Sequence, residues 1–241
     1  IGNGQMINLI IACPCEEKRR TKERRQAEAI RRANNIERLR KEGIRGADLL
    51  NARFENDDSP KSVASITMRR YVEVFDEMYK KGYGVILYGN IGTGKTFYAG
   101  CAATAVAEME KSVLIISMPE IVMTLQDSRQ KRELIEKITR PALLVIDDLG
   151  AERNTTFGLE QVFAVINRRV LSKKPLIVTT NLSMAELKNP DNDDLRRIYD
   201  RVLGVCPVRI ALTGPSRRTG GQNASTYDIL WGNQKDALKD K

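Results

Sequence analysis

Residues 85–96 read VILYGNIGTGKT, and residues 143–150 read LLVIDDLG. In the first segment an aliphatic run is followed by eight residues that fit the pattern G-x-x-x-x-G-K-[ST]. The glycines of such a loop let successive backbone N–H groups point at phosphate oxygens, and the helix that follows presents its positive N-terminal end. The expected context is present, because a strand precedes the loop and a helix is predicted over about residues 97–109. The first segment therefore predicts a nucleotide-binding site.

Within this loop, two side chains have distinct chemical roles. The Lys95 ammonium can reach the β- and γ-phosphates as a point charge, and the Thr96 hydroxyl can ligate Mg²⁺. The predicted ligand is therefore a nucleotide with Mg²⁺. We assign the nucleotide contacts to the whole loop and the residue after it: Gly89, Asn90, Ile91, Gly92, Thr93, Gly94, Lys95, Thr96 and Phe97.

The second segment predicts the other half of the metal site. Asp147 stands at the tip of an aliphatic strand, where a carboxylate can hold Mg²⁺ directly or through water. Asp148 follows it, where a carboxylate could orient or deprotonate the attacking water. An ordinary acidic turn could also end a strand, but here the acidic pair accompanies a complete phosphate loop. We therefore assign Asp147 to the metal and Asp148 to catalysis.

Two further residues are candidates for the reaction itself. Asn181 follows the aliphatic run at residues 176–180, where a side-chain amide could sense the γ-phosphate and hold the attacking water. Arg201 lies on a charged, helix-like stretch before the last aliphatic run. Both have plainer interpretations, since Asn181 could simply open a turn and Arg201 could lie on a solvated helix face.

Along the chain around these motifs, short aliphatic runs alternate with stretches that are long enough to form helices. The five runs are residues 85–88, 113–116, 142–146, 176–180 and 208–212. Near-continuous apolar strands separated by helices are typical of a parallel sheet covered on both faces. The sequence therefore predicts an α/β fold with a five-stranded parallel sheet. A further helix is predicted over residues 63–81, ending at Gly82.

The net charge of +9 is concentrated near the N-terminus. Residues 16–45 carry twelve Lys and Arg against six acidic residues, lack proline, and contain a helix stop signal at Gly43. Ala29, Ala33, Ile36 and Leu39 form a thin apolar stripe at helical spacing. The stretch predicts a basic helix. It is either a solvated, salt-bridged linker or an arm that docks on a partner or lies along nucleic-acid phosphates.

The composition excludes several classes of site and location. The chain has 241 residues and no His, so Ser-His-Asp and Cys-His catalysis and His-ligated metal sites are excluded. Its four Cys are typical of reduced thiols, and no apolar run approaches the length of a membrane span, so we expect a cytoplasmic protein without membrane contact. Cys13 and Cys15 are either half of a Zn²⁺ site completed by a preceding Cys pair or plain thiols.

Taken together, the motifs resemble those of one family. The chain resembles the AAA+ ATPases of the DnaC/DnaI helicase-loader family and, close behind them, the IstB transposition-helper ATPases. The resemblance runs from about residue 54 to residue 218 through FENDDSP, YVEVFDEM, LYGNIGTGKT, LLVIDDLGAE, VTTNLSMAEL, RRIYDRV and GPSRR. It implies an AAA+ P-loop ATPase core with a reduced C-terminal lid.

The resemblance also implies roles for single residues. Gly89 to Thr96 would be Walker A, and Asp147 with Asp148 would end Walker B. Asn181 would be the sensor 1 residue, and Arg201 the arginine finger that acts on a neighbouring subunit's nucleotide. Arg217 would be the sensor 2 residue, with Arg218 as the alternative one position along. Many AAA+ proteins carry Glu where Asp148 stands, which puts efficient hydrolysis in doubt; Glu152 could assist.

The flanking regions complete the expected organisation. We expect a partner-binding extension over residues 1–52, an ATPase core over residues 53–218, and a tail over residues 219–241. In the tail, the apolar trio at residues 229–231 would pack on the core or bind a partner. By resemblance, residues 118–140 would form an extra helical element that touches single-stranded DNA. Its DNA-facing charges would be Arg129, Lys131 and Arg132, unless these only form a solvated surface.

Three functions are compatible with these features. The leading hypothesis is an ATPase with slow hydrolysis, stimulated by assembly or DNA, that loads a DnaB-like replicative helicase onto single-stranded DNA as an ATP-bound homo-oligomer. The first alternative is an IstB-type helper that delivers a transposase to DNA. The second is a nucleotide switch that does not hydrolyse ATP, because the Asp148 side chain is too short to activate water.

Overall fold

The structure is a computed structural model that describes residues 14–127, 129–151 and 156–217. Several residues of the sequence hypotheses lie outside this part of the chain: Cys13, Glu152, Arg218 and the apolar trio at residues 229–231. The same holds for almost all of the expected lid and tail.

A parallel sheet forms the centre of the described structure. Its strands are β1 (Val85–Gly89), β2 (Val113–Ser117), β3 (Leu143–Leu149), β4 (Leu176–Thr180) and β5 (Val208–Leu212). They lie in the order β2-β3-β4-β1-β5, and every neighbouring pair is parallel. The predicted five-stranded parallel sheet is therefore confirmed, although β3 continues three residues past the expected end at residue 146 and so includes both aspartates.

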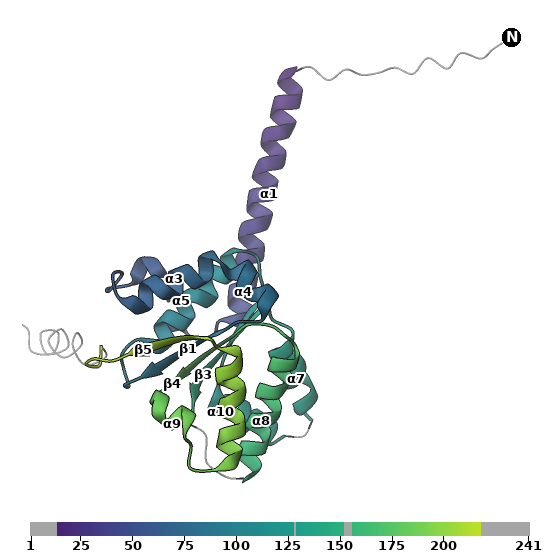
Figure 1. The fold of residues 1–241 in the computed structure, drawn as a ribbon. Coiled ribbons are helices and arrows are strands. Elements are labelled where there is room, and N and C mark those ends of the chain that lie inside the picture. Colours follow the sequence, from purple (N-terminus) through teal and green to yellow (C-terminus); the bar gives the residue numbers. More distant parts are fainter. Residues whose placement is uncertain (1–13, 128, 152–155, 218–241) are drawn as a thin grey trace, which may run out of the picture.

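Helices cover both faces of the sheet. One face carries α2 (Ala47–Leu50), α3 (Val63–Glu73), α4 (Phe75–Lys81) and α5 (Lys95–Glu108), with the 3₁₀ turn η1 (Phe54–Asn56) beside them. The other carries α6 (Met118–Leu125), α7 (Lys131–Thr139), α8 (Thr156–Leu171), α9 (Met184–Lys188) and α10 (Asp193–Val205). Figure 1 shows α3 and α5 on one side of the strands and α7, α8 and α10 on the other.

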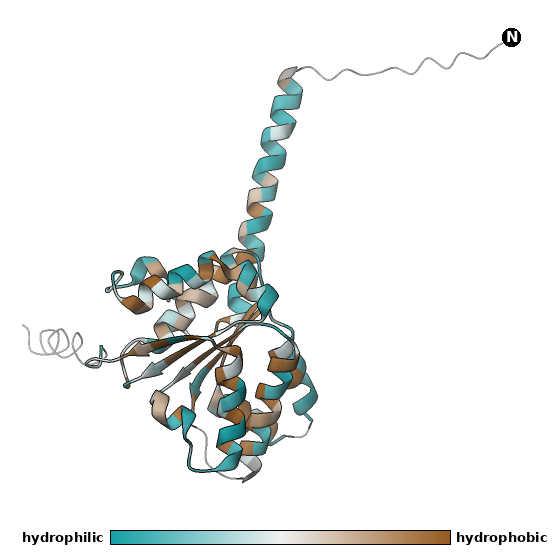
Figure 2. Cartoon of the chain, viewed as in Figure 1, coloured by the Kyte–Doolittle hydropathy of each residue, from teal (hydrophilic) through white to brown (hydrophobic). Residues whose placement is uncertain are grey.

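The strands supply side chains to two separate cores. In β1, Val85 and Leu87 pack with the helices of the α5 face, whereas Ile86 packs with those of the α8 face. Because successive strand residues point to opposite faces, an unbroken aliphatic run fills both cores at once. The apolar colour of the strands in Figure 2 reflects this.

The helix predicted over residues 63–81 is two helices. α3 ends at Glu73 and α4 starts at Phe75, and Val74 between them has φ −103° and ψ 21°, outside the α-helical region. Tyr71 and Phe75 are buried on either side of the break with their rings edge-on, centroids 6.0 Å apart. The apolar spacing continues across the break, so the pattern predicted one helix and was wrong on this point.

The basic stretch is a single helix, α1 (Pro14–Gly43), which projects from the body (Figure 1). Ala29 and Ala33 of its apolar stripe are exposed, and only Ile36 and Leu39 near its C-terminal end are half-buried. In Figure 2 most of this helix has the colour of hydrophilic residues. None of the described helices combines the length and apolar character that crossing a membrane requires.

The chain enters the core directly after α1. Ile44 is 1% exposed and packs in the α5-side core with Ala52. α2 and the residues after it lie tightly against α5, since a Cβ added at Gly100 would lie 3.2 Å from Leu49 Cδ2 and 2.7 Å from the Cβ of Ala52. Leu39 and Ile44, both within the expected extension over residues 1–52, therefore pack against the core, and the boundary expected at residue 53 stays a prediction.

Candidate nucleotide site

The phosphate loop connects β1 to α5 in the way that the motif requires. Gly92 has φ 79° and Gly94 has φ 96°, both in the left-handed region that favours glycine. A Cβ at Gly92 would also overlap with the side chain of Ser216, so the approach of the C-terminal segment requires glycine there. α5 begins at Lys95, and its N-terminal end faces the loop.

Lys95 is held beneath the loop by backbone oxygens. Its side chain is almost fully buried, and its Nζ donates to the carbonyl oxygens of Gly89 at 2.9 Å and Asn90 at 2.6 Å. The Thr93 hydroxyl also donates to Asn90 O, at 2.8 Å. These bonds place the ammonium group inside the loop, where it can exchange a carbonyl for a phosphate oxygen.

Thr96 and Asp147 meet at the edge of the sheet, as the metal hypothesis requires. The Thr96 Oγ1 donates to Asp147 Oδ1 at 2.9 Å, although the two residues come from different segments. Thr179, fully buried on β4, donates to the same carboxylate oxygen at 2.6 Å. A hydroxyl and a carboxylate oxygen are hard ligands of the kind that Mg²⁺ prefers. The donor set therefore fits this ion.

Asp148 has an unusual backbone conformation. Its φ of 57° lies in the left-handed region, and its N–H donates to Thr179 Oγ1 at 3.0 Å. The pairing of β3 with β4 shifts register between Ile146 and Leu149 at this point. The shift turns Asp148 away from the regular strand, and its side chain lines the cavity described next.

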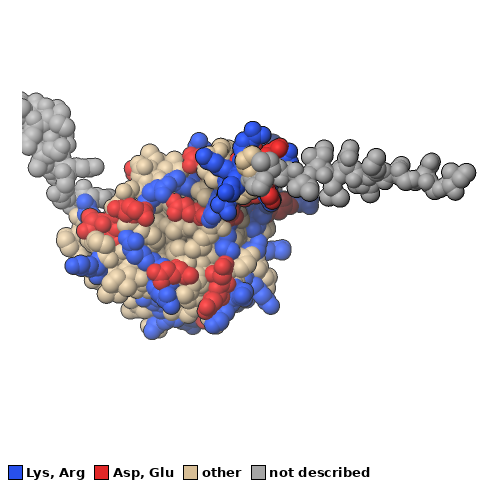
Figure 3. Space-filling model, turned by 90° about the horizontal axis from the view of Figure 1, so that it is seen from above, with Lys and Arg blue, Asp and Glu red and all other residues tan. Residues whose placement is uncertain are grey.

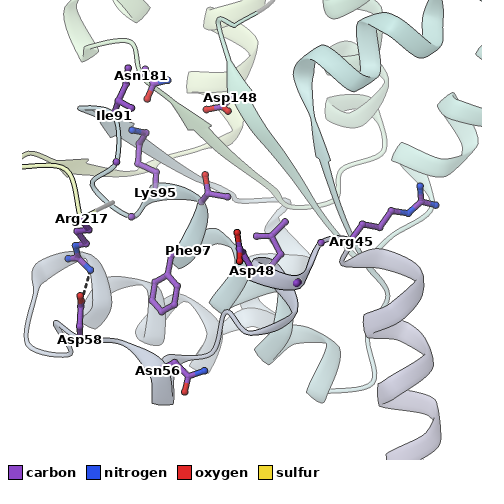
Figure 4. A pocket seen from close by; sticks show the side chains of 16 residues that line it. Arg45, Asp48, Asn56, Asp58, Ile91, Lys95, Phe97, Asp148, Asn181 and Arg217 are labelled. Atoms are coloured by element: carbon purple, nitrogen blue, oxygen red, sulfur yellow. Dashed lines mark hydrogen bonds and ion pairs between the residues drawn. The ribbon is translucent and has the colours of Figure 1, made fainter. Parts of the chain in front are cut away.

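A cavity of about 750 Å³ lies over the phosphate loop. In Figure 4, Asn181 and Asp148 lie at the same end of it as Lys95, and Phe97 lies further along. The structure thus brings together the loop, Asp148, Asn181 and Arg217. The lining residues are Arg45, Gly46, Ala47, Asp48, Leu49, Asn56, Asp58, Ile91, Gly92, Gly94, Lys95, Thr96, Phe97, Asp148, Asn181 and Arg217.

Several of these lining residues were not assigned to the site from the sequence. Residues 45–49 reach it because α2 packs on α5, the helix that starts in the phosphate loop. Asn56 and Asp58 belong to the FENDDSP block, which carried the family resemblance without a role for either side chain. The one signal that could have placed Asn56 and Asp58 at the site was that their block belongs to the same family pattern as the motifs.

Arg217 is placed over the phosphate loop. Its backbone N–H donates to Gly92 O at 2.8 Å, and its guanidinium donates to Asp58 Oδ1 at 2.7 Å, the dashed line of Figure 4. The same guanidinium lies 5.7 Å from the centre of the Tyr98 ring. This cation therefore lines the cavity beside Gly94, in contact with Asp58.

Arg201 lies outside the cavity, on the exposed surface of α10. Its guanidinium carbon is 5.8 Å from the centre of the Phe163 ring on α8. Within one chain it is not among the residues that line the nucleotide site. This position is compatible with action on a neighbouring subunit, which remains a prediction.

The three residues expected to face DNA lie at the start of α7 and in the loop before it. Arg129 pairs with Asp127 at 3.3 Å, and Arg132 with Glu136 at 3.6 Å. Both arginine side chains, and Lys131 between them, are exposed. Leu134 and Ile138 anchor this helix in the core.

The zinc hypothesis has no support within the described residues. Cys15 is exposed at the start of α1, whereas Cys101 and Cys206 are buried in the core. In the part of the chain that the structure describes, no group of three or more His, Cys, Asp or Glu side chains could hold a metal ion.

Surface charge is concentrated on α1. Figure 3 looks at the molecule from the side to which α1 projects, and Lys and Arg side chains gather around this helix. Over the rest of this face, basic and acidic side chains are interspersed. Many of the α1 charges form i,i+4 pairs, including Arg20 with Glu16 at 2.8 Å and Arg24 with Glu28 at 3.0 Å.

Comparison with known proteins agrees with this site. The replicative helicase loader DnaI of Bacillus subtilis (strain 168) is 30% identical over 235 residues, which cover 90% of this chain and 71% of that protein. A crystal structure of DnaI has a TM-score of 0.61 at 26% identity and covers 73% of this chain and 95% of that one. The expected AAA+ P-loop core is thereby confirmed.

A second relative comes from a mobile element. Rv3427c, a protein in an insertion sequence of Mycobacterium tuberculosis, is 28% identical over 142 residues, which cover 57% of this chain and 56% of that protein. The family model described as IstB-like ATP binding protein matches residues 7–223, nearly the whole chain and all of the site. The chain therefore belongs to the IstB-like ATP-binding protein family.

Proposed function

We propose that this protein is an ATP-dependent loader of a replicative DNA helicase. The observation that carries the ATP-dependent part is the hydrogen bond between Thr96 and Asp147, which joins the phosphate loop to the acidic end of β3. Support for the helicase as partner comes from DnaI, which aligns with 90% of this chain, whereas the insertion-sequence protein aligns with 57%.

In this proposal, the chain's own residues hold and cleave ATP. The loop amides and Lys95 bind the phosphates, and Thr96 with Asp147 holds Mg²⁺, which neutralises charge on the phosphates when bound. Asp148 accepts a proton from the attacking water, and Asn181 orients that water. The short Asp148 side chain favours slow hydrolysis, stimulated by assembly or by DNA, so that ATP acts as a timer for release.

The remaining surfaces take the partners. The N-terminal region with α1, which projects from the core, grips the helicase. Arg129, Lys131 and Arg132 contact the backbone of single-stranded DNA, through bonds that weaken with salt. ATP binding favours a homo-oligomer in which Arg201 of one subunit reaches the nucleotide of the next.

The partner assignment can be tested with purified proteins. The full chain is offered a replicative helicase and an IS21-type transposase side by side, with ATP or without nucleotide, and bound protein is recovered. We expect retention of the helicase and ATP-dependent transfer of it to single-stranded DNA. Lys95→Ala should lose ATP binding and transfer, and Lys111→Ala, a change at a half-buried residue outside the cavity, serves as the control. Retention of the transposase alone would overturn the proposal.

Hydrolysis is tested separately. Phosphate release is measured with and without single-stranded DNA, at protein concentrations that span assembly. A rate that rises with DNA or with protein concentration is expected. ATP binding without any phosphate release would instead identify a nucleotide switch.

A further inference from the structure

The Arg217 guanidinium is held at a defined place by an acidic partner far away in the sequence. Asp58 and Arg217 are 159 residues apart, yet their side chains meet at 2.7 Å on the wall of the cavity. Arg217 is held a second time by its backbone bond to Gly92 O, at 2.8 Å. A Cβ added at Gly94 would lie 3.6 Å from the same guanidinium nitrogen. The cation therefore lies beside Gly94 of the phosphate loop.

Asp58 is itself part of an anchored turn. The neighbouring Asp57 accepts a bond from the Ser59 N–H at 2.9 Å and from the Tyr98 hydroxyl at 3.2 Å. That hydroxyl also bonds with Ser62 Oγ at 3.0 Å. Tyr98 is fully buried on α5, three residues after Lys95. The turn that carries Asp58 is thus fixed to the helix that begins in the phosphate loop.

We propose that Asp58 is a positioning residue for nucleotide binding: it holds the Arg217 guanidinium over the phosphate loop so that its remaining N–H donors face the phosphates. A guanidinium carries five N–H donors in a fixed fork, so one carboxylate partner leaves others available. This inference rests on the proposed ATP-dependent function and deepens it, because it adds a residue that acts through Arg217.

The exposure of the pair supports a role in binding over one in stability. The Asp58 side chain is 70% exposed and that of Arg217 35% exposed. Ion pairs at such exposure contribute little to the free energy of folding. A bound phosphate, by contrast, gains from a guanidinium whose orientation is already fixed, because less freedom is lost on binding.

Asp58 could instead have the opposite role, and its removal would then change the ATP affinity in the opposite direction. If the carboxylate competed with phosphate for the guanidinium, its removal would tighten ATP binding. If it positions the guanidinium, its removal weakens ATP binding. The direction of the change in affinity therefore distinguishes the two roles.

The test uses the full chain and four variants: Asp58→Asn, Asp58→Glu, Arg217→Gln, and the double variant Asp58→Asn/Arg217→Gln. ATP affinity, kcat and KM for hydrolysis and the thermal midpoint are measured for each. We expect Asp58→Asn to weaken ATP binding roughly fivefold, with an unchanged midpoint. Asp58→Glu should restore part of the affinity. The double variant should bind no more weakly than Arg217→Gln alone, because Asp58 acts through Arg217.

A matched control is Asp76→Asn. Asp76 is also an exposed aspartate in an ion pair, with Lys111 at 2.8 Å, but lies outside the cavity, so its loss should leave ATP affinity unchanged. Unchanged or tighter ATP binding by Asp58→Asn would overturn the positioning role, as would additive effects in the double variant. Failure of the unsubstituted protein to bind ATP would instead contradict the proposed function itself.

Discussion

The Thr179 hydroxyl joins both acidic residues at the end of β3: it donates to Asp147 Oδ1 at 2.6 Å and accepts from Asp148 N at 3.0 Å. A hydroxyl has one donor and two acceptor positions, so this single group can make both bonds at once. It fixes the carboxylate that faces Thr96 and holds the backbone of Asp148 in its left-handed conformation.

Replacing Thr179 by Val should therefore affect both stability and hydrolysis. The substitution preserves shape but leaves a buried N–H and a carboxylate oxygen without this partner, a loss of about 1–3 kcal/mol in the free energy of unfolding. Thr179→Ser should recover most of it. Chemical denaturation and phosphate release measure the two effects.

A suitable control is Thr104→Val on α5. The Thr104 hydroxyl is also buried, and it has no hydrogen-bond partner among the described residues. Its removal should leave stability unchanged or raised. An equal loss of stability in both valine variants would contradict the bridging role of Thr179.

Asp147→Asn should remove the Mg²⁺ dependence of ATP binding. The amide keeps the size of the side chain but loses the negative charge that a hard divalent cation requires. Calorimetric titration with ATP, in the presence of Mg²⁺ and of a chelator, should give two different affinities for the unsubstituted protein and similar ones for the variant. Asp76→Asn, remote from the site, should behave like the unsubstituted protein.

Much of this site follows from local sequence. The strand, the glycine loop, Lys95 and Thr96 are contiguous, and the loop conformation is set by residue type alone. Asp147 ends an aliphatic run, and parallel strands place their carboxyl ends at one edge of the sheet. The meeting of Thr96 with Asp147 was therefore predictable, and the structure confirms it.

Other features depend on tertiary packing and left no local signal. The contact of Asp58 with Arg217 joins segments 159 residues apart. The break at Val74 has neither Gly nor Pro to mark it, and the apolar spacing continues on both sides. Both the Asp58–Arg217 contact and the helix break depend on how separate segments pack on the α5 side of the sheet. The residue pattern of one segment carries no information about that packing.

Arg201→Ala should spare ATP binding and lose the hydrolysis that depends on assembly. The side chain lies outside the cavity of its own subunit, so binding by one chain does not require it. Phosphate release measured against protein concentration should lose its upward curvature in this variant. Arg197→Ala, an exposed arginine on the same helix, is the matched control. Unchanged stimulation in Arg201→Ala would refute action on a neighbouring subunit.

The buried thiols should resist alkylation. Burial raises the pKa of Cys101 to about 12 and also raises that of Cys206, so both remain protonated at pH 8, and the thiolate is the reactive form. Labelling of the folded protein with iodoacetamide at pH 8, followed by mass spectrometry, should modify the exposed Cys15 well before either of them. Rapid labelling of Cys101 in the folded protein would contradict the packing described for α5.

Arg169 should contribute strongly to stability although it lies outside the site. Its side chain is fully buried on α8, and its guanidinium donates to backbone carbonyl oxygens around the starts of β3 and β4. The acceptors are Ile138 at 3.3 Å, Pro141 at 2.9 Å, Ala142 at 3.2 Å and Pro175. Loss of this group leaves several buried carbonyls unpaired, because no water replaces it in a packed core.

Arg169→Met should therefore lower the free energy of unfolding by about 3 kcal/mol. Burial lowers the pKa of Arg169 to about 10, so the group is charged in the folded and the unfolded chain below pH 9. The difference between the variant and the unsubstituted protein should consequently be constant between pH 6 and 9. Urea denaturation at several pH values measures it. The adjacent Arg168 is exposed, and Arg168→Met should change stability little, so equal losses in the two variants would contradict the role assigned to Arg169.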